Sequence, residues 1–184
     1  MEDKRSNVDF SKHVITTIQS FEGYKNIFKF ADPETSFYAI TFINCCGVMA
    51  VTGDCGNWIF CREFHPSKDN FVSDEYWLEK LRISSTQNPT DYDEENTRKK
   101  IEGMIDDNDN DDLNAEDISY LKELLMYTGE GEMRYLVYAH DNLPNGRDHE
   151  FVPYCKRLNP MLAVVFDAFD EICNRMKLIP QDKE

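Results

Sequence analysis

Carboxylates are concentrated in one short stretch of the sequence, where they could bind a cation or a basic partner. Between Asp91 and Asp117 there are twelve acidic residues against three basic ones, which gives nine of the chain's fifteen net negative charges. Like charges packed this closely must face water, a cation or a basic surface. Six of these carboxylates are the candidate partner-binding residues: Asp106, Asp107, Asp109, Asp111, Asp112 and Glu116.

The same stretch can be laid on the ligand positions of a calcium-binding EF-hand loop. The oxygen ligands would then come from Asp106, Asn108, Asn110, Asp112, Asn114 and Asp117. However, Asp111 occupies the position of the glycine that allows the sharp turn, and Asp117 is too short to replace the usual bidentate glutamate. The sequence therefore favours a basic partner over a specific calcium site, and we expect no cofactor.

Cysteine and histidine offer a second set of reactive groups. A zinc site could draw on Cys45 or Cys46, Cys55, Cys61 and His65, but the paired short spacing of zinc knuckles is missing. A nucleophile and base could be Cys61 with His65, or Cys155 with His140 and Asp141. No hydrolase or phosphate-binding motif accompanies them, so we predict no catalytic residues and no metal site. A Cys/His metal-binding domain or enzyme stays the alternative.

The first half of the chain has the pattern of an antiparallel sheet. Four runs are rich in aromatic and β-branched residues, and residues suited to tight turns separate them. They cover residues 24–30, 37–43, 48–52 and 58–61. We predict a four-stranded meander, with Trp58 buried in the core rather than presented to a partner.

The second half has helical periodicity. Ser73 and Asn114 are suited to cap helices, and a polar helix is predicted over residues 93–105 between them. Residues 132–140 suit either a strand or a helix, with helix favoured. The last helix begins at Asn159 and Pro160 and carries an apolar stripe until Pro180, which predicts a helix packed on the sheet. The fold class is therefore α+β, a single domain over residues 1–184 with an acidic interhelical loop at about 91–117.

Composition and charge restrict the function. The chain has 184 residues, 41% of them hydrophobic, and no apolar run approaches the roughly 20 residues that span a bilayer. No signal peptide is recognisable, so a cytoplasmic location with reduced, buried cysteines is predicted. A net charge of -15 argues against binding nucleic acid or anionic membranes directly and favours a basic protein surface.

Three segments carry a resemblance to known proteins: Tyr38–Met49, Gly53–Pro66 and Val165–Cys173. Together they resemble small accessory proteins of prophages and other bacterial mobile elements. The resemblance implies a setting in which small acidic proteins inhibit host defence nucleases, as anti-CRISPR proteins do. We therefore expect a non-enzymatic inhibitor that binds a basic, nucleic-acid-handling surface of a host effector such as a CRISPR-type nuclease.

Overall fold

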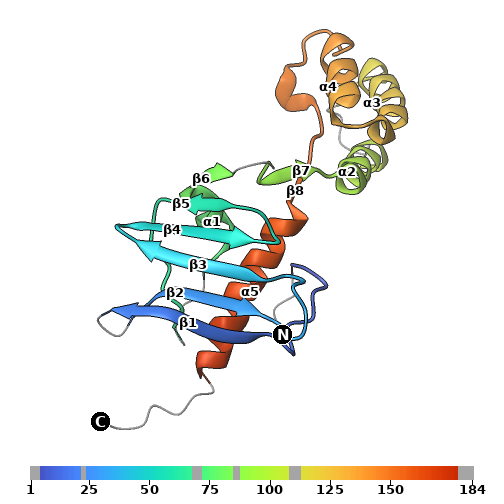
Figure 1. The fold of residues 1–184 in the computed structure, drawn as a ribbon. Helices are drawn as coiled ribbons and strands as arrows, with labels where there is room; N and C mark the ends of the chain where they lie inside the picture. Colours follow the sequence, from blue (N-terminus) through green and yellow to red (C-terminus); the bar gives the residue numbers. More distant parts are fainter. Residues whose placement is uncertain (1–4, 22–23, 68–71, 85–87, 108–112, 178–184) are drawn as a thin grey trace. The chain divides into compact units, whose positions relative to one another are not determined.

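The chain divides into two compact units in a computed structural model that describes residues 5–21, 24–67, 72–84, 88–107 and 113–177. The sheet unit comprises Met1–Pro89 and Leu158–Glu184, and the helical unit, Thr90–Arg157, is inserted between these segments (Figure 1). The α+β class is confirmed. Whether the two units unfold together, as the prediction of a single domain requires, stays a prediction.

The sheet unit is built on a six-stranded antiparallel sheet in which strands follow one another in chain order. Neighbouring strands can pair in this way because short turns join most of them. The predicted meander is present, with one further strand at each edge. The strands are β1 (Val14–Phe21), β2 (Tyr24–Ala31), β3 (Ile40–Cys45), β4 (Val48–Gly53), β5 (Trp58–Phe60) and β6 (Leu81–Ser84).

Strand β3 begins three residues later than the sequence predicted. Tyr38 has a φ of 56°, in the left-handed region, and such a residue cannot continue a β ladder. Phe37 just before it is 74% exposed rather than buried. Pairing starts where Ile40 lies opposite Gly53, and the side chains of Ile40 and Phe42 then enter the core.

Helix α5 (Pro160–Lys177) lies across one face of the sheet (Figure 1). The side-chain oxygen of Asn159 accepts the N–H of Met161 at 2.9 Å, which confirms the predicted N-cap. Phe166 and Phe169 are fully buried against the strands, as the apolar stripe predicted. The short helix α1 (Asp74–Lys80) is capped by Ser73, whose hydroxyl accepts the N–H of Tyr76.

Aromatic residues fill the core of the sheet unit. Trp77 stacks on Phe64 and Phe166 with ring centroids 4.1 and 4.9 Å apart. Trp58 is buried, as predicted, and its indole N–H donates to the carbonyl of Cys55 at 2.7 Å. His13 is also buried, between the rings of Phe10 and Phe30.

The cysteines are less buried than predicted. Cys55 and Cys173 are buried, whereas Cys45, Cys46 and Cys61 are exposed. Alternate residues of a strand point to opposite faces and turn residues face solvent, so a cysteine in or beside a strand need not be buried. All six cysteines are free thiols in the structure.

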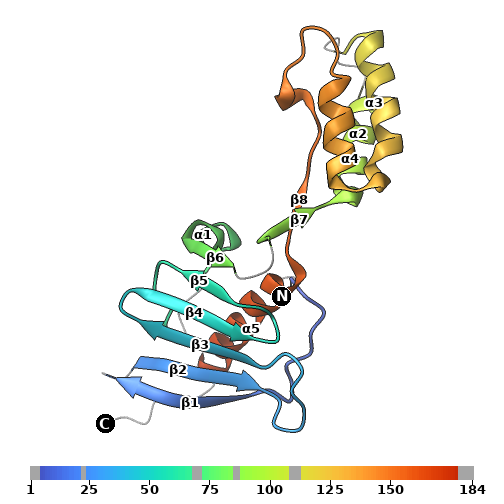
Figure 2. The same cartoon turned by 45° about the horizontal axis from the view of Figure 1, so that its top comes forward.

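The helical unit contains three main helices that lie side by side (Figure 2). They are α2 (Glu94–Asp106), α3 (Ala115–Tyr127) and α4 (Glu132–Asp141), so residues 132–140 are helical, as favoured. Two 3-10 turns, η1 (Thr128–Glu130) and η2 (His149–Phe151), lie between and after them. Strand β7 (Thr90–Tyr92) precedes the helices and pairs with β8 (Lys156–Leu158).

The segment 91–117 is mostly secondary structure rather than a loop. Residues 91 and 92 lie in β7, thirteen residues form α2, and residues 115–117 begin α3. The charge density suggested a loop, but Asp93 caps α2 by accepting the N–H of Asn96 at 3.0 Å, and Glu94 and Glu95 lie at the positive end of its dipole. Carboxylates therefore stabilise the start of α2.

Candidate protein-binding face of the helical unit

The candidate residues that the structure describes lie where α2 ends and α3 begins. Asp106 is the last residue of α2, and Asp107 is its C-cap, with its N–H donating to the carbonyl of Gly103 at 2.8 Å. Glu116 is in the first turn of α3. All three side chains are exposed. Asp109, Asp111 and Asp112 lie outside the described residues.

Asp117, in contrast, is withdrawn from the surface. Its side chain is fully buried and accepts two hydrogen bonds from Arg147, at 3.0 and 2.7 Å. It also accepts the backbone N–H of Asn114 at 2.9 Å, which completes a capping box. Arg147, followed by the Asn114 N–H, holds the pKa of this carboxyl below its usual value. Asp117 is therefore a structural residue, which removes the last ligand of the calcium-loop alignment.

Most of the chain's net charge lies in the helical unit. This unit has 18 acidic and eight basic residues, a net charge of -10, whereas the larger sheet unit carries the remaining -5. Some of the few cations are engaged locally: Lys99 pairs with Glu95 at 2.6 Å and Arg134 with Glu130 at 2.8 Å. The potential around the unit is consequently negative and attracts cations.

Exposed apolar side chains lie among these charges. Met126 on α3 is 69% exposed, and Met133 and Val137, one turn apart on α4, are 75% and 52% exposed. A hollow of about 350 Å³ is lined by Met133 and Val137. Exposed methionines suit binding surfaces because their unbranched side chains adapt to varied partners.

A second hollow, of about 290 Å³, adjoins the first. It is lined in part by Glu116, Ser119 and Glu123 of α3, and the two hollows share Tyr138 and Asn142. We call seven of the lining residues together the α3/α4 face: Glu116, Ser119, Glu123, Met133, Val137, Tyr138 and Asn142. The face thus has an acidic end and an apolar end.

The centre of the α3/α4 face is held in place by an aromatic pair. The rings of Tyr127 and Tyr138 stack with centroids 3.8 Å apart. The Tyr138 hydroxyl donates to Glu123, and this hydrogen bond raises the pKa of Tyr138 to about 12. The face is therefore preorganised, which reduces the ordering cost of binding.

The apolar end of this face was missed from the sequence. Met133 and Val137 lie in residues 132–140, for which the sequence favoured a helix without indicating which of its side chains are exposed. The four-residue spacing of Met133 and Val137 was the available signal, since residues four apart lie on the same face of a helix. The role of Arg147 had no sequence signal, because it lies 30 residues from Asp117.

The alternative site of cysteine and histidine is not assembled. In the part of the chain that the structure describes, no group of three His, Cys, Asp or Glu side chains could hold a metal ion. Cys55, one of the proposed zinc ligands, is buried in the core, and burial raises the pKa of its thiol to about 12. His65 instead contacts the carboxylate of Glu63 at 2.8 Å.

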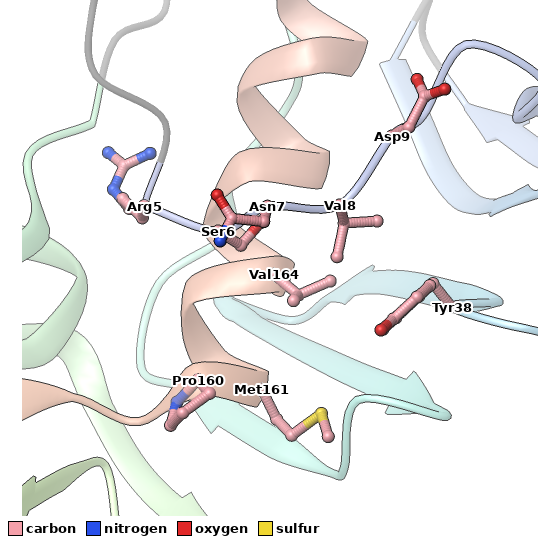
Figure 3. A pocket seen from close by; sticks show the side chains of 9 residues that line it. All are labelled: Arg5, Ser6, Asn7, Val8, Asp9, Tyr38, Pro160, Met161 and Val164. Carbon is pink, nitrogen blue, oxygen red and sulfur yellow. The ribbon is translucent and has the colours of Figure 1, made fainter.

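A third hollow lies in the sheet unit, beside the start of α5. It has a volume of about 480 Å³ and is lined by the segment 5–9, Tyr38 and three residues of α5 (Figure 3). Arg5 at its edge is engaged with Asp74, Asp167 and Asp170. This network fastens the N-terminal segment to α5, and the lining contains no paired acid and base, so the hollow has the features of a structural junction.

Comparison with known proteins adds no relative. No protein-family model, curated protein sequence or solved structure matches the chain. Among the described residues, no helix combines the length and apolar character needed to cross a membrane.

Proposed function

We propose that the protein is a non-enzymatic interaction protein whose helical unit binds a basic protein surface. The observation that carries the proposal is the combination, on one 68-residue unit, of a net charge of -10 with exposed Met126, Met133 and Val137. Carboxylates attract and orient a basic partner, and apolar side chains supply the buried contact that lengthens its residence.

In its specific form, the partner is a basic, nucleic-acid-handling surface of a bacterial defence nuclease, and binding inhibits that nuclease as an anti-CRISPR protein does. Two observations support this form: the charge, which mimics the sign of nucleic-acid phosphates, and the resemblance to accessory proteins of mobile elements. Both observations indicate the class of partner, not its identity. The target itself must be found by experiment.

The test begins with capture of a partner from a bacterial lysate at low and high salt, followed by measurement of association and dissociation rates. The variant neutralises the described acidic residues with Asp106→Asn, Asp107→Asn and Glu116→Gln. A matched control removes three exposed charges of the sheet unit with Glu34→Gln, Glu75→Gln and Glu79→Gln. Both proteins then have the same net charge.

We expect the helical-unit variant to associate roughly tenfold more slowly at low salt, with a smaller difference at high salt, because exposed charges act on encounter and are screened. The control should stay within about twofold of the unmodified protein. Equal rates for both variants would contradict the proposal, since net charge alone would then account for binding. A nuclease assay with the captured partner tests the inhibitory form.

A further inference from the structure

The hairpin between β3 and β4 brings two thiols together at the surface of the sheet unit. Cys45 ends β3 and is paired with Val48 at the start of β4, so Cys46 and Gly47 form a two-residue turn. Their φ values are 53° and 81°, both positive, as in a type I′ turn. The sulfur atoms of Cys45 and Cys46 are 3.4 Å apart, and both residues are exposed.

A cysteine at the first turn position is unusual. Asn, Asp and Gly dominate this position because they tolerate the left-handed conformation, whereas other residues are strained there. Asn would have formed the same turn without a thiol. Cys46 therefore puts its sulfur next to that of Cys45 at some cost in backbone strain.

The turn is also fixed from the side. The N–H of Gly47 donates to Glu63 at 2.8 Å, and the other carboxylate oxygen of Glu63 contacts His65 at 2.8 Å. The Gly47 N–H, and then His65, lower the pKa of Glu63, so the carboxylate stays charged and keeps its hold on the turn. The space above Gly47 is open, since a Cβ built there meets no atom within 4 Å. The two thiols are thus preorganised and accessible.

A bridging atom suits this pair better than a direct bond between the sulfurs. The Cα atoms of adjacent residues are about 3.8 Å apart across a trans peptide, below the roughly 4.4–6.8 Å found in most disulfides. Zinc takes four protein ligands in a structural site, and the described residues provide no group of three. The pair therefore suits an atom that needs only two sulfur ligands from the protein.

We propose that Cys45 and Cys46 form a dithiol site that chelates a trivalent arsenical. With a monosubstituted arsenical carrying two hydroxyl groups, two As–S bonds form and two As–O bonds break. Each thiol proton leaves with one hydroxyl group as water, so two waters are released, and no atom is oxidised or reduced. This chemistry uses the protonated thiols, in keeping with the raised pKa of Cys45, whose thiol is hydrogen-bonded to Cys46.

The probe for the test is phenylarsine oxide, added to the intact reduced protein. Mass spectrometry should show one phenylarsenic group bound per chain. Ethanedithiol should remove this group, whereas excess monothiol should not, because release requires a competing chelating ligand. Two single variants test the site: Cys45→Ser, and Cys46→Asn, which keeps a residue suited to the turn. Each should abolish the adduct that resists excess monothiol. Circular dichroism checks that both variants are folded.

Cys61→Ser is the matched control, since Cys61 is an exposed thiol that the proposed site does not use. This variant should bind the probe like the unmodified protein. The proposal is overturned if the unmodified protein forms no stable adduct, if the adduct persists without Cys45 or Cys46, or if Cys61→Ser removes it. None of these outcomes bears on binding by the helical unit.

Discussion

The two units of this chain use their side chains differently. In the sheet unit, large aromatic residues pack inward: Phe28, Phe42, Phe60, Trp77 and Phe166 are completely buried. The helical unit has a smaller core around Ile101, Leu121, Leu124 and Tyr135 and carries twice the net charge on fewer residues. One unit is thus organised mainly around its core, and the other mainly around its surface.

This contrast indicates where a partner should bind. Charges that repel one another destabilise a compact state, so a dense acidic surface without a structural role has a stability cost that recognition can explain. Asp93 and Asp117 do have structural roles, as helix caps. Within the described part of the chain, the side chains of Asp106, Asp107 and Glu116 form no salt bridge, which leaves them suited to contact another molecule.

Excision of the helical unit is expected to have the largest effect. The N–H of Asn159 donates to the carbonyl of Pro89 at 3.0 Å, so a linker of about four glycine and serine residues can replace residues 90–157. The remaining sheet unit should fold, since its aromatic core is complete, but should capture no partner. Circular dichroism and pull-down measure the two properties. An unfolded product would show that the sheet unit depends on the insertion.

Truncation of the aromatic core tests the sheet unit from within. Phe166→Ala removes a ring stacked on Trp77 and should lower the free energy of unfolding by about 3–5 kcal/mol. Calorimetry should show whether this change lowers one transition of two or the only transition. A single transition shifted as a whole would support the original prediction that the chain is one cooperative domain.

Sequence patterns predicted local structure well and long-range organisation poorly. Caps at Ser73, Asn114 and Asn159 were recognisable because each acts within three residues of its own position. The edge strands β1 and β6 have no strong apolar alternation in sequence, and the apolar side chains of Val14, Ile18 and Ile83 are exposed in them. The division into two units was not apparent either, because no linker composition marks Pro89 or Leu158.

The candidate site shows the same limit. Charge density identified the acidic segment, but it could not separate exposed Asp106 from buried Asp117, which depends on Arg147 thirty residues away. Likewise, the sequence alone does not show whether an apolar side chain on a helix is buried in the core or exposed. Met133 and Val137 belong to that class.

Loss of the Asp117 carboxylate should destabilise the helical unit. Asp117→Asn removes a buried acceptor from Arg147 and should cost about 2–3 kcal/mol. The folded pKa of Asp117 is lowered, so its stabilisation is complete above the unfolded value of about 3.9 and is lost as pH falls through the folded pKa. Denaturant titrations should therefore show the variant and the unmodified protein converging below about pH 4. A difference that persists at a pH below the folded pKa of Asp117 would assign the effect to packing.

The smallest expected effect comes from neutralising single carboxylates at the two ends of α2. The comparison distinguishes the contribution of the helix dipole from that of net charge. Asp106 is at the negative end of the helix dipole and Glu94 at the positive end, so Asp106→Asn should stabilise the unit and Glu94→Gln should destabilise it, each by about 0.5 kcal/mol. Both changes remove one negative charge, which makes each the control for the other. Thermal unfolding at low and high salt measures the difference, which should shrink as salt rises. If both variants are stabilised equally, general self-repulsion governs the unit. If they diverge as expected, the acidic residues at the C-terminal end of α2 destabilise the helix. Neutralising these residues should then stabilise the fold and, under the proposed function, weaken binding of the partner.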